Sequence, residues 1–122
     1  MTFAYGMIVV AMFLPYAAVV LAKSGGVDNH APRATLAGLT GWRQRADWAH
    51  RNHFEAFAPF AVAVIVAELA QVAQARIDIA AGAFIALRIV YTALYIADLA
   101  ALRSIAWSLA FICVLALFVM SA

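Results

Sequence analysis

Charged side chains are scarce in this chain of 122 residues: only 11% are Asp, Glu, Lys or Arg, whereas 68% are hydrophobic. A soluble domain of this length leaves a large part of its surface in water and cannot bury that much apolar material. The few basic residues are scattered and form no stripe with interleaved aromatics, so we expect no nucleic-acid partner. The composition is typical of an integral membrane protein.

Cysteine is represented by a single residue, Cys113, so an intramolecular disulfide is excluded. Cys113 lies in an apolar run, where a free cysteine packs as a small hydrophobic side chain. Serine–histidine–aspartate catalysis has no candidate, because Ser104 and Ser108 have no histidine near them in sequence and no nucleophile-elbow motif occurs. The N-terminal apolar run lacks a preceding basic region, so we do not expect it to be a signal peptide.

Long hydrophobic segments dominate what is present. Four can be read: Thr2–Ala22, a segment from near Trp42–Asp47 to about Ala73, about Ile77–Leu99, and Ser104–Ala122. Each can cross roughly 30 Å of hydrocarbon as a helix. Strands are not expected, because period-2 alternation is absent. Short connections predict an all-α membrane protein, an antiparallel four-helix bundle in one domain over residues 1–122. The exception is Lys23–Gly41, which reads as a longer loop.

Positive charge is unevenly distributed over the three connections. The second connection holds only Arg76, the third holds Arg103, and the first holds four basic residues: Lys23, Arg33, Arg43 and Arg45. The positive-inside rule then places the first and third connections in the cytoplasm and both termini outside. We therefore expect an integral protein of the inner (cytoplasmic) membrane.

Two stripes of polar side chains interrupt the apolar segments. The first, on the second segment, comprises Trp48, Arg51, Asn52, Glu55 and Pro59. The second, on the third segment, comprises Arg88, Tyr91, Tyr95 and Asp98. Their spacings put each set on one face of a helix. Ionisable groups at membrane depth are costly and mark functional sites.

The two stripes lie at matching depths. At about 1.5 Å per residue, Asn52 and Glu55 lie roughly 8–12 Å inside and Arg88 roughly 15 Å inside. Both can therefore converge on one polar pocket, with Arg103 at its cytoplasmic mouth. Arg51, Arg88 and Arg103 outnumber the acids Glu55 and Asp98, which favours a small ligand with carboxylates. The alternative is that these groups only pair with one another between helices, including Arg51 with Glu55 at i,i+4.

The string AHRNHFEAFAPF at Ala49–Phe60 resembles the signature of the MAPEG family (membrane-associated proteins in eicosanoid and glutathione metabolism). That signature is an Arg-x-x-x-Asn-x-x-Glu stretch, often followed by Pro-Phe. Here Asn52 and Glu55 match its Asn and Glu, and Pro59 with Phe60 matches the tail.

The third and fourth segments add to this resemblance. The pattern Arg88-x-x-Tyr91-x-x-x-Tyr95 is similar to the arginine and tyrosines that the family carries there, and Arg103 falls where the family has an arginine. The resemblance covers nearly the whole chain. It implies a homotrimer of four-helix subunits in membrane lipid, with glutathione as cosubstrate between adjacent subunits.

The resemblance also implies roles for individual residues. Glutathione would be bound by Asn52, Glu55, Arg88, Tyr91 and Tyr95, with Arg51 as a partial substitute for the first arginine of the signature. Arg103 would stabilise the thiolate, because a nearby guanidinium favours the charged nucleophile. A lipid-facing opening would admit a lipophilic electrophile or hydroperoxide. The expected function is a glutathione-dependent, or related thiol-dependent, transferase or peroxidase.

Trp48 stands where the signature has its first arginine, and it cannot pair with a carboxylate. This departure favours an alternative function, a non-catalytic scaffold or an accessory subunit of a larger complex. A small transporter is a third hypothesis, which the lack of discontinuous helices and repeat symmetry disfavours. Asp47, His50 and His53 drift around the helix at i, i+3 and i+6, so we expect interfacial histidines and no metal site.

Overall fold

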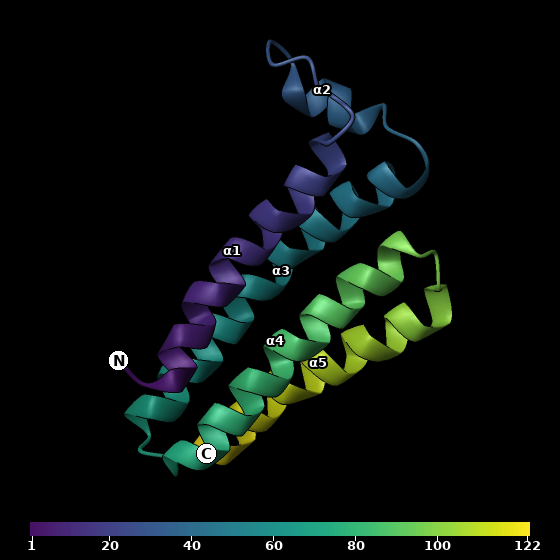
Figure 1. Ribbon diagram of the computed structural model, residues 1–122. Coiled ribbons are helices and arrows are strands. Elements are labelled where there is room, and N and C mark those ends of the chain that lie inside the picture. The colour runs from purple at the N-terminus through teal and green to yellow at the C-terminus, as the bar shows by residue number, and fades with distance from the viewer.

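The computed structural model describes residues 1–122 as α-helices joined by short connections, with no strand (Figure 1). The helices are α1 (Phe3–Lys23), α2 (Pro32–Ala37), α3 (Gly41–Leu69), α4 (Gln74–Ile96) and α5 (Ala100–Ser121). All except α2 have the length and apolar composition needed to cross a membrane. The prediction of an all-helical chain with four membrane-length helices is confirmed.

All three connections differ from the predicted boundaries. The segment Lys23–Gly41, predicted to be a loop, contains α2, whose first helical residue is a proline with its backbone angle already suited to a helix. The predicted ends near Ala73 and Leu99 are each a few residues late. Gln71 and Asp98 adopt positive φ angles of 56° and 63°, which the right-handed helix cannot accommodate, so α3 and α4 end just before them.

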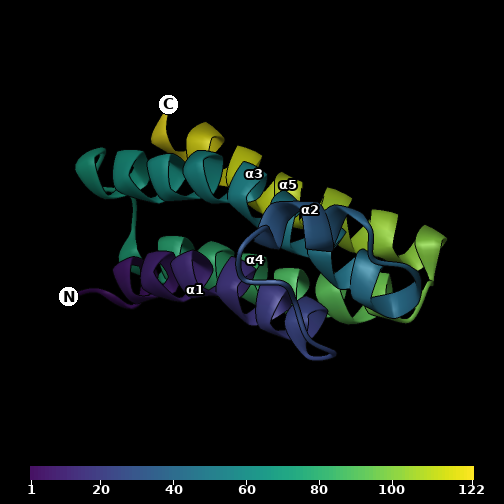
Figure 2. The same ribbon diagram turned by 90° about the horizontal axis from the view of Figure 1, so that it is seen from above.

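The four long helices form a two-by-two bundle. α1 packs along α3 and α4 packs along α5, as Figure 1 shows. Seen from above in Figure 2, α1 also lies beside α4, and α3 lies beside α5. Contacts between α3 and α4 join residues early in one to residues late in the other, as between Arg45 and Ile96 and between Asn52 and Arg88.

The apolar core occupies the half of the bundle that holds the first parts of α1 and α4 and the last parts of α3 and α5. Six of its 13 buried residues are alanine, and small side chains allow helices to approach closely where lipid supplies no hydrophobic driving force. Phe60 of α3 and Phe84 of α4 stack with ring centroids 3.9 Å apart and both are buried. Large apolar side chains also cover the outside, including Phe13, Ile79 and Val119, as a lipid-facing surface requires.

Two arginines of α3 fasten the ends of the neighbouring helices. Arg43 donates from Nε to the Ala22 carbonyl at 2.8 Å and from Nη2 to the Gly26 carbonyl at 2.9 Å. Gly25 makes room for this contact, because a Cβ atom there would lie 2.6 Å from Arg43 Nη1. Carbonyls at a helix C-terminus lack intrahelical partners and attract cations, so Arg43 caps α1.

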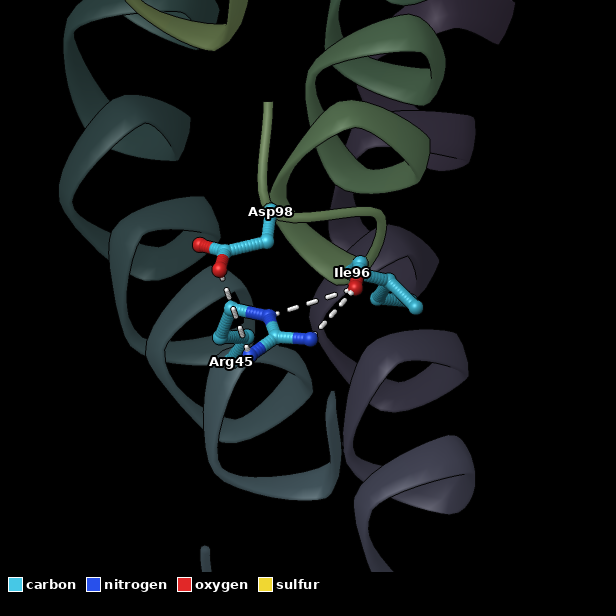
Figure 3. Close-up of polar contacts among 3 residues, drawn as sticks. All are labelled: Arg45, Ile96 and Asp98. Carbon is cyan, nitrogen blue, oxygen red and sulfur yellow. Dashed lines mark hydrogen bonds and ion pairs between the residues drawn. The ribbon is translucent and has the colours of Figure 1, made fainter. Parts of the chain in front are cut away.

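Arg45 does the same for α4. Its Nε and Nη2 donate to the Ile96 carbonyl at 3.2 and 3.0 Å, and its Nη1 lies 3.9 Å from Asp98 Oδ2 (Figure 3). Asp98 was predicted to belong to the second polar stripe, facing the buried arginines. That prediction is wrong, because the turn after Ile96 carries the carboxylate to the end of the bundle, where it pairs with Arg45 and is 73% exposed.

Candidate functional site

Arg88 of α4 is the centre of the polar site. Its side chain is 1% exposed, although it carries a charge. Nη1 donates to Asn52 Oδ1 at 2.9 Å and Nη2 lies 3.1 Å from His53 Nδ1, while the buried Nε has no hydrogen-bond partner. The guanidinium carbon also lies 4.3 Å from the centroid of the Tyr91 ring. No carboxylate forms an ion pair with Arg88.

Asn52 links Arg88 to the acid of the first stripe. Its Nδ2 donates to Glu55 Oε2 at 2.8 Å while its Oδ1 accepts from Arg88. The two contacts fix the orientation of the amide, because each end has one chemically suitable neighbour. The structure thus brings Asn52, Glu55 and Arg88 together, and Glu55 reaches the guanidinium only through Asn52.

Arg51 is engaged elsewhere. Its Nε and Nη2 donate to Asp47 Oδ2 at 3.0 and 2.9 Å, and Asp47 is 2% exposed. The pairing of Arg51 with Glu55, which the i,i+4 spacing allowed, does not form. Asp47 lies one turn earlier on the same helix, and the Glu55 carboxylate is held by Asn52. Arg51 therefore brings little net charge to the site.

Arg103 of α5 belongs to a cluster of cationic and aromatic side chains that lies next to Asn52. Its guanidinium carbon lies 4.3 Å from the centroid of the Tyr95 ring, and it has no carboxylate partner. Tyr95 packs edge-on against Tyr91 at 5.5 Å and tilts against Trp48 at 6.2 Å. Aromatic faces attract cations, so Tyr91 and Tyr95 hold Arg88 and Arg103 at neighbouring positions without neutralising either.

Two adjoining cavities are lined by these residues. The first, of about 130 Å³, has Asn52, Glu55 and Arg88 on its polar side and apolar side chains on the other: Ala56, Pro59, Phe84, Trp107, Ala110, Phe111 and Val114. The second, of about 400 Å³, is lined by Asn52, Tyr91, Tyr95, Arg103, Ser104, Trp107 and Ser108. Asn52 and Trp107 belong to both, so a polar cavity that contains Arg103 borders a more apolar cavity that contains Arg88.

Two further members of the site were not predicted. His53 and Thr92 were missed as site residues, and His53 was interpreted as interfacial, whereas it is 4% exposed and contacts Thr92 Oγ1 at 2.7 Å. His50, half-buried, lies with Nδ1 2.8 Å from the Pro15 carbonyl of α1. One signal was present: Thr92 lies one turn after Arg88 and so shares its helix face. Nothing on α3 itself marks His53, because both of its partners belong to α4.

Together these features define an all-helical integral membrane protein with a polar site inside its helix bundle. The sequence model of the MAPEG family matches residues 1–122, the whole chain, and the chain therefore belongs to the MAPEG family. The resemblance read from the motifs on α3 and α4 is thus confirmed. No curated protein and no solved structure matches the chain.

Proposed function

We propose that this protein is a membrane-embedded glutathione-dependent, or related thiol-dependent, transferase or peroxidase acting on a lipophilic electrophile. Membership of the MAPEG family supports a glutathione-related role. The observation that carries the proposal is Arg88, a buried guanidinium with an unpartnered Nε and no ion pair to a carboxylate. An uncompensated buried charge is expensive, and a carboxylate of the bound thiol would compensate it.

Each residue of the site has a proposed contact with the thiol that follows from its chemistry. Arg88 would hold a carboxylate of the thiol, and Asn52 would add an amide contact beside it. Glu55 is exposed and accepts hydrogen bonds, which suits an ammonium group. Tyr91 and Tyr95 would contribute hydroxyl groups. Arg51, one turn before Glu55, would add a peripheral contact to the thiol after its ion pair with Asp47 breaks.

Arg103 is the proposed catalytic group. A thiol of ordinary pKa is mostly protonated at neutral pH, and a guanidinium beside the sulfur favours the thiolate, which is the nucleophile. Arg103 qualifies because it lines the polar cavity and has no carboxylate to satisfy it. In the transferase reaction the thiol proton leaves to water, the thiolate sulfur bonds to an electrophilic carbon, and the leaving group departs with that carbon's bonding electrons.

The proposal extends to the assembly and its placement. We propose a single four-helix domain over residues 1–122, with antiparallel spans, that forms homotrimers with the thiol between adjacent subunits. The connections before α3 and after α4 would face the cytoplasm, as the basic residues around them indicate. The apolar cavity beside the polar one, and the apolar outer surface of the bundle, would give a lipophilic substrate its route from the membrane.

Calorimetry tests the proposal on purified oligomers in mild detergent. Titration with glutathione should release heat and saturate at millimolar concentration or below. Arg88→Met, which keeps side-chain volume but removes the charge, should bind at least about tenfold more weakly. Arg76→Met serves as the matched control, because Arg76 is exposed and lies at the opposite end of α4.

A second function, that of a non-catalytic scaffold or accessory subunit, is favoured by one observation. Trp48 is 43% exposed and packs on Tyr95, while Arg51 is paired with Asp47, so this wall of the site lacks a free cation. In that case Arg88 and Arg103 should tolerate lysine without loss of function, and the chain should co-purify with a partner protein. Solitary oligomers that bind a thiol would contradict it.

A further inference from the structure

His53 has no part in the thiol chemistry proposed above, yet it is among the most enclosed polar side chains of the protein. It projects from α3 and is 4% exposed. Both ring nitrogens meet groups of α4: Nδ1 lies 3.1 Å from Arg88 Nη2, and Nε2 lies 2.7 Å from Thr92 Oγ1. A histidine held at both nitrogens has a defined proton position, which its neighbours determine.

Both neighbours require the same state of the ring. A guanidinium can only donate, so Nδ1 must accept from Arg88. The single hydroxyl proton of Thr92 goes to the Arg88 carbonyl, 3.1 Å away, so Thr92 Oγ1 must accept from Nε2. His53 is therefore neutral, with its one proton on Nε2. His50 is the opposite case, because its Nδ1 faces the Pro15 carbonyl, which can only accept.

We infer that His53 is a positioning residue that fixes the direction of the Arg88 guanidinium through an acceptor at Nδ1. Asn52 holds Nη1 and His53 holds Nη2, so two protein acceptors set the plane of the group. The N–H groups that remain serve an anion in the cavity that Arg88 lines. An arginine fixed before the ligand arrives loses less side-chain entropy on binding. The ligand in this inference rests on the proposed function, whereas the proton position does not.

Nitrogen NMR of the protein labelled with ¹⁵N-histidine tests the proton position without any ligand. His30→Gln removes the exposed third histidine, and the His53 signals are assigned by their loss in His53→Asn. The expected spectrum has one ring protonated on Nε2 (His53) and a second protonated on Nδ1 (His50). In Arg88→Met the preference of His53 should relax toward a mixture. A wild-type His53 protonated on Nδ1, or on both nitrogens, would overturn the inference.

Two substitutions separate positioning from packing. His53→Asn retains an acceptor oxygen near the place of Nδ1, whereas His53→Leu fills the space without one. We expect the KM for glutathione to rise about tenfold in His53→Leu, to stay within about threefold in His53→Asn, and kcat to change little in both. Equal losses in the two variants, or a loss confined to kcat, would contradict a positioning role.

Thr92→Val covers the case in which His53→Leu fails to assemble. Valine has nearly the same shape as threonine and removes the acceptor for Nε2–H, but Arg88 still donates to Nδ1. The inference therefore predicts that the proton stays on Nε2 in an intact oligomer. A shift of the proton to Nδ1 in Thr92→Val would count against it. If wild-type protein binds no glutathione, the proposed function fails, while the NMR spectra still decide whether Arg88 and His53 are coupled.

Discussion

At the scale of single residues, this protein keeps cations inside the bundle and satisfies them with neutral partners. Arg88 has an amide, an imidazole and an aromatic ring around it, and Arg103 has the Tyr95 ring. The carboxylates that could neutralise them are held by other groups, Glu55 by Asn52 and Asp47 by Arg51. A site arranged in this way keeps its charge available for an anionic ligand.

Arg103→Ala tests whether that charge serves the chemistry. Removing a guanidinium that stabilises the thiolate should lower kcat/KM at neutral pH roughly 100-fold. The loss should shrink as the pH rises, because a free thiol then ionises without help. Turnover of a lipophilic electrophile from pH 6 to about pH 9 provides the measurement. Arg76→Ala is the control, and a loss that is constant across this range would contradict the role.

At the scale of helices, the arginines near the start of α3 hold the ends of α1 and α4. Arg45 makes two hydrogen bonds to the Ile96 carbonyl, at the end of the helix that carries Arg88, Tyr91 and Tyr95. The same end leads through a short turn into α5 and Arg103. The spacing between Tyr95 and Arg103 therefore depends on a contact made by α3.

Arg45→Met should loosen this turn. The loss of a charged donor to a helix-terminal carbonyl predicts a decrease of about 1–2 kcal/mol in the free energy of unfolding. Hydrogen exchange should accelerate at the amides of Asp98 and Leu99, which close the last turn of α4. Arg33→Met, at an exposed position of α2, is the control. Unchanged exchange in Arg45→Met would show that the turn holds without Arg45.

The stacked pair Phe60 and Phe84 tests how α3 and α4 are held together. Phe60→Ala empties a fully buried position. Lipid is as apolar as the core, so only the packing loss applies and not the transfer from water. We expect about 2 kcal/mol of destabilisation, less than the same change costs in a soluble protein. Thermal unfolding in detergent measures it, with Phe13→Ala on the exposed face of α1 as control. Equal melting shifts in both variants would contradict this packing.

At the scale of the whole molecule, hydrophobic length and the position of polar residues were enough to predict four spans and the meeting of Asn52 with Arg88. Both stripes follow from helical periodicity, which sequence displays directly. The position of the Asp98 carboxylate was not predictable from helical periodicity, because a positive φ angle in the turn after α4 carries it to Arg45.

The acid that pairs with Arg51 on α3 could not be predicted from the sequence either. Arg51 has acids one turn before and one turn after it, and spacing alone does not distinguish Asp47 from Glu55. The outcome depends on Arg88 of α4, which binds the Asn52 Oδ1 and leaves the Asn52 Nδ2 to donate to Glu55. His53 was missed for the same reason, since the identity of its neighbours comes from α4 and not from its own helix.

The lone cysteine makes the proposed membrane placement easy to test. In a Cys113→Ala background, single cysteines at Ser24, Gln71 and Leu99 report on the three connections. The positive-inside rule predicts that an impermeant thiol reagent applied outside cells labels position 71 only. Labelling at positions 24 and 99 but not 71 would invert the proposed orientation. Labelling at 24 without 99 would contradict the antiparallel four-span arrangement.

Calorimetric titration of glutathione into the purified wild-type oligomer and into Arg88→Met tests whether Arg88 binds the thiol. Oligomer size and helix content should be the same in both samples. We expect saturable binding by the wild type and binding at least about tenfold weaker in the variant. Absence of binding to an intact wild-type oligomer at millimolar glutathione, or equal binding by both proteins, would contradict this expectation.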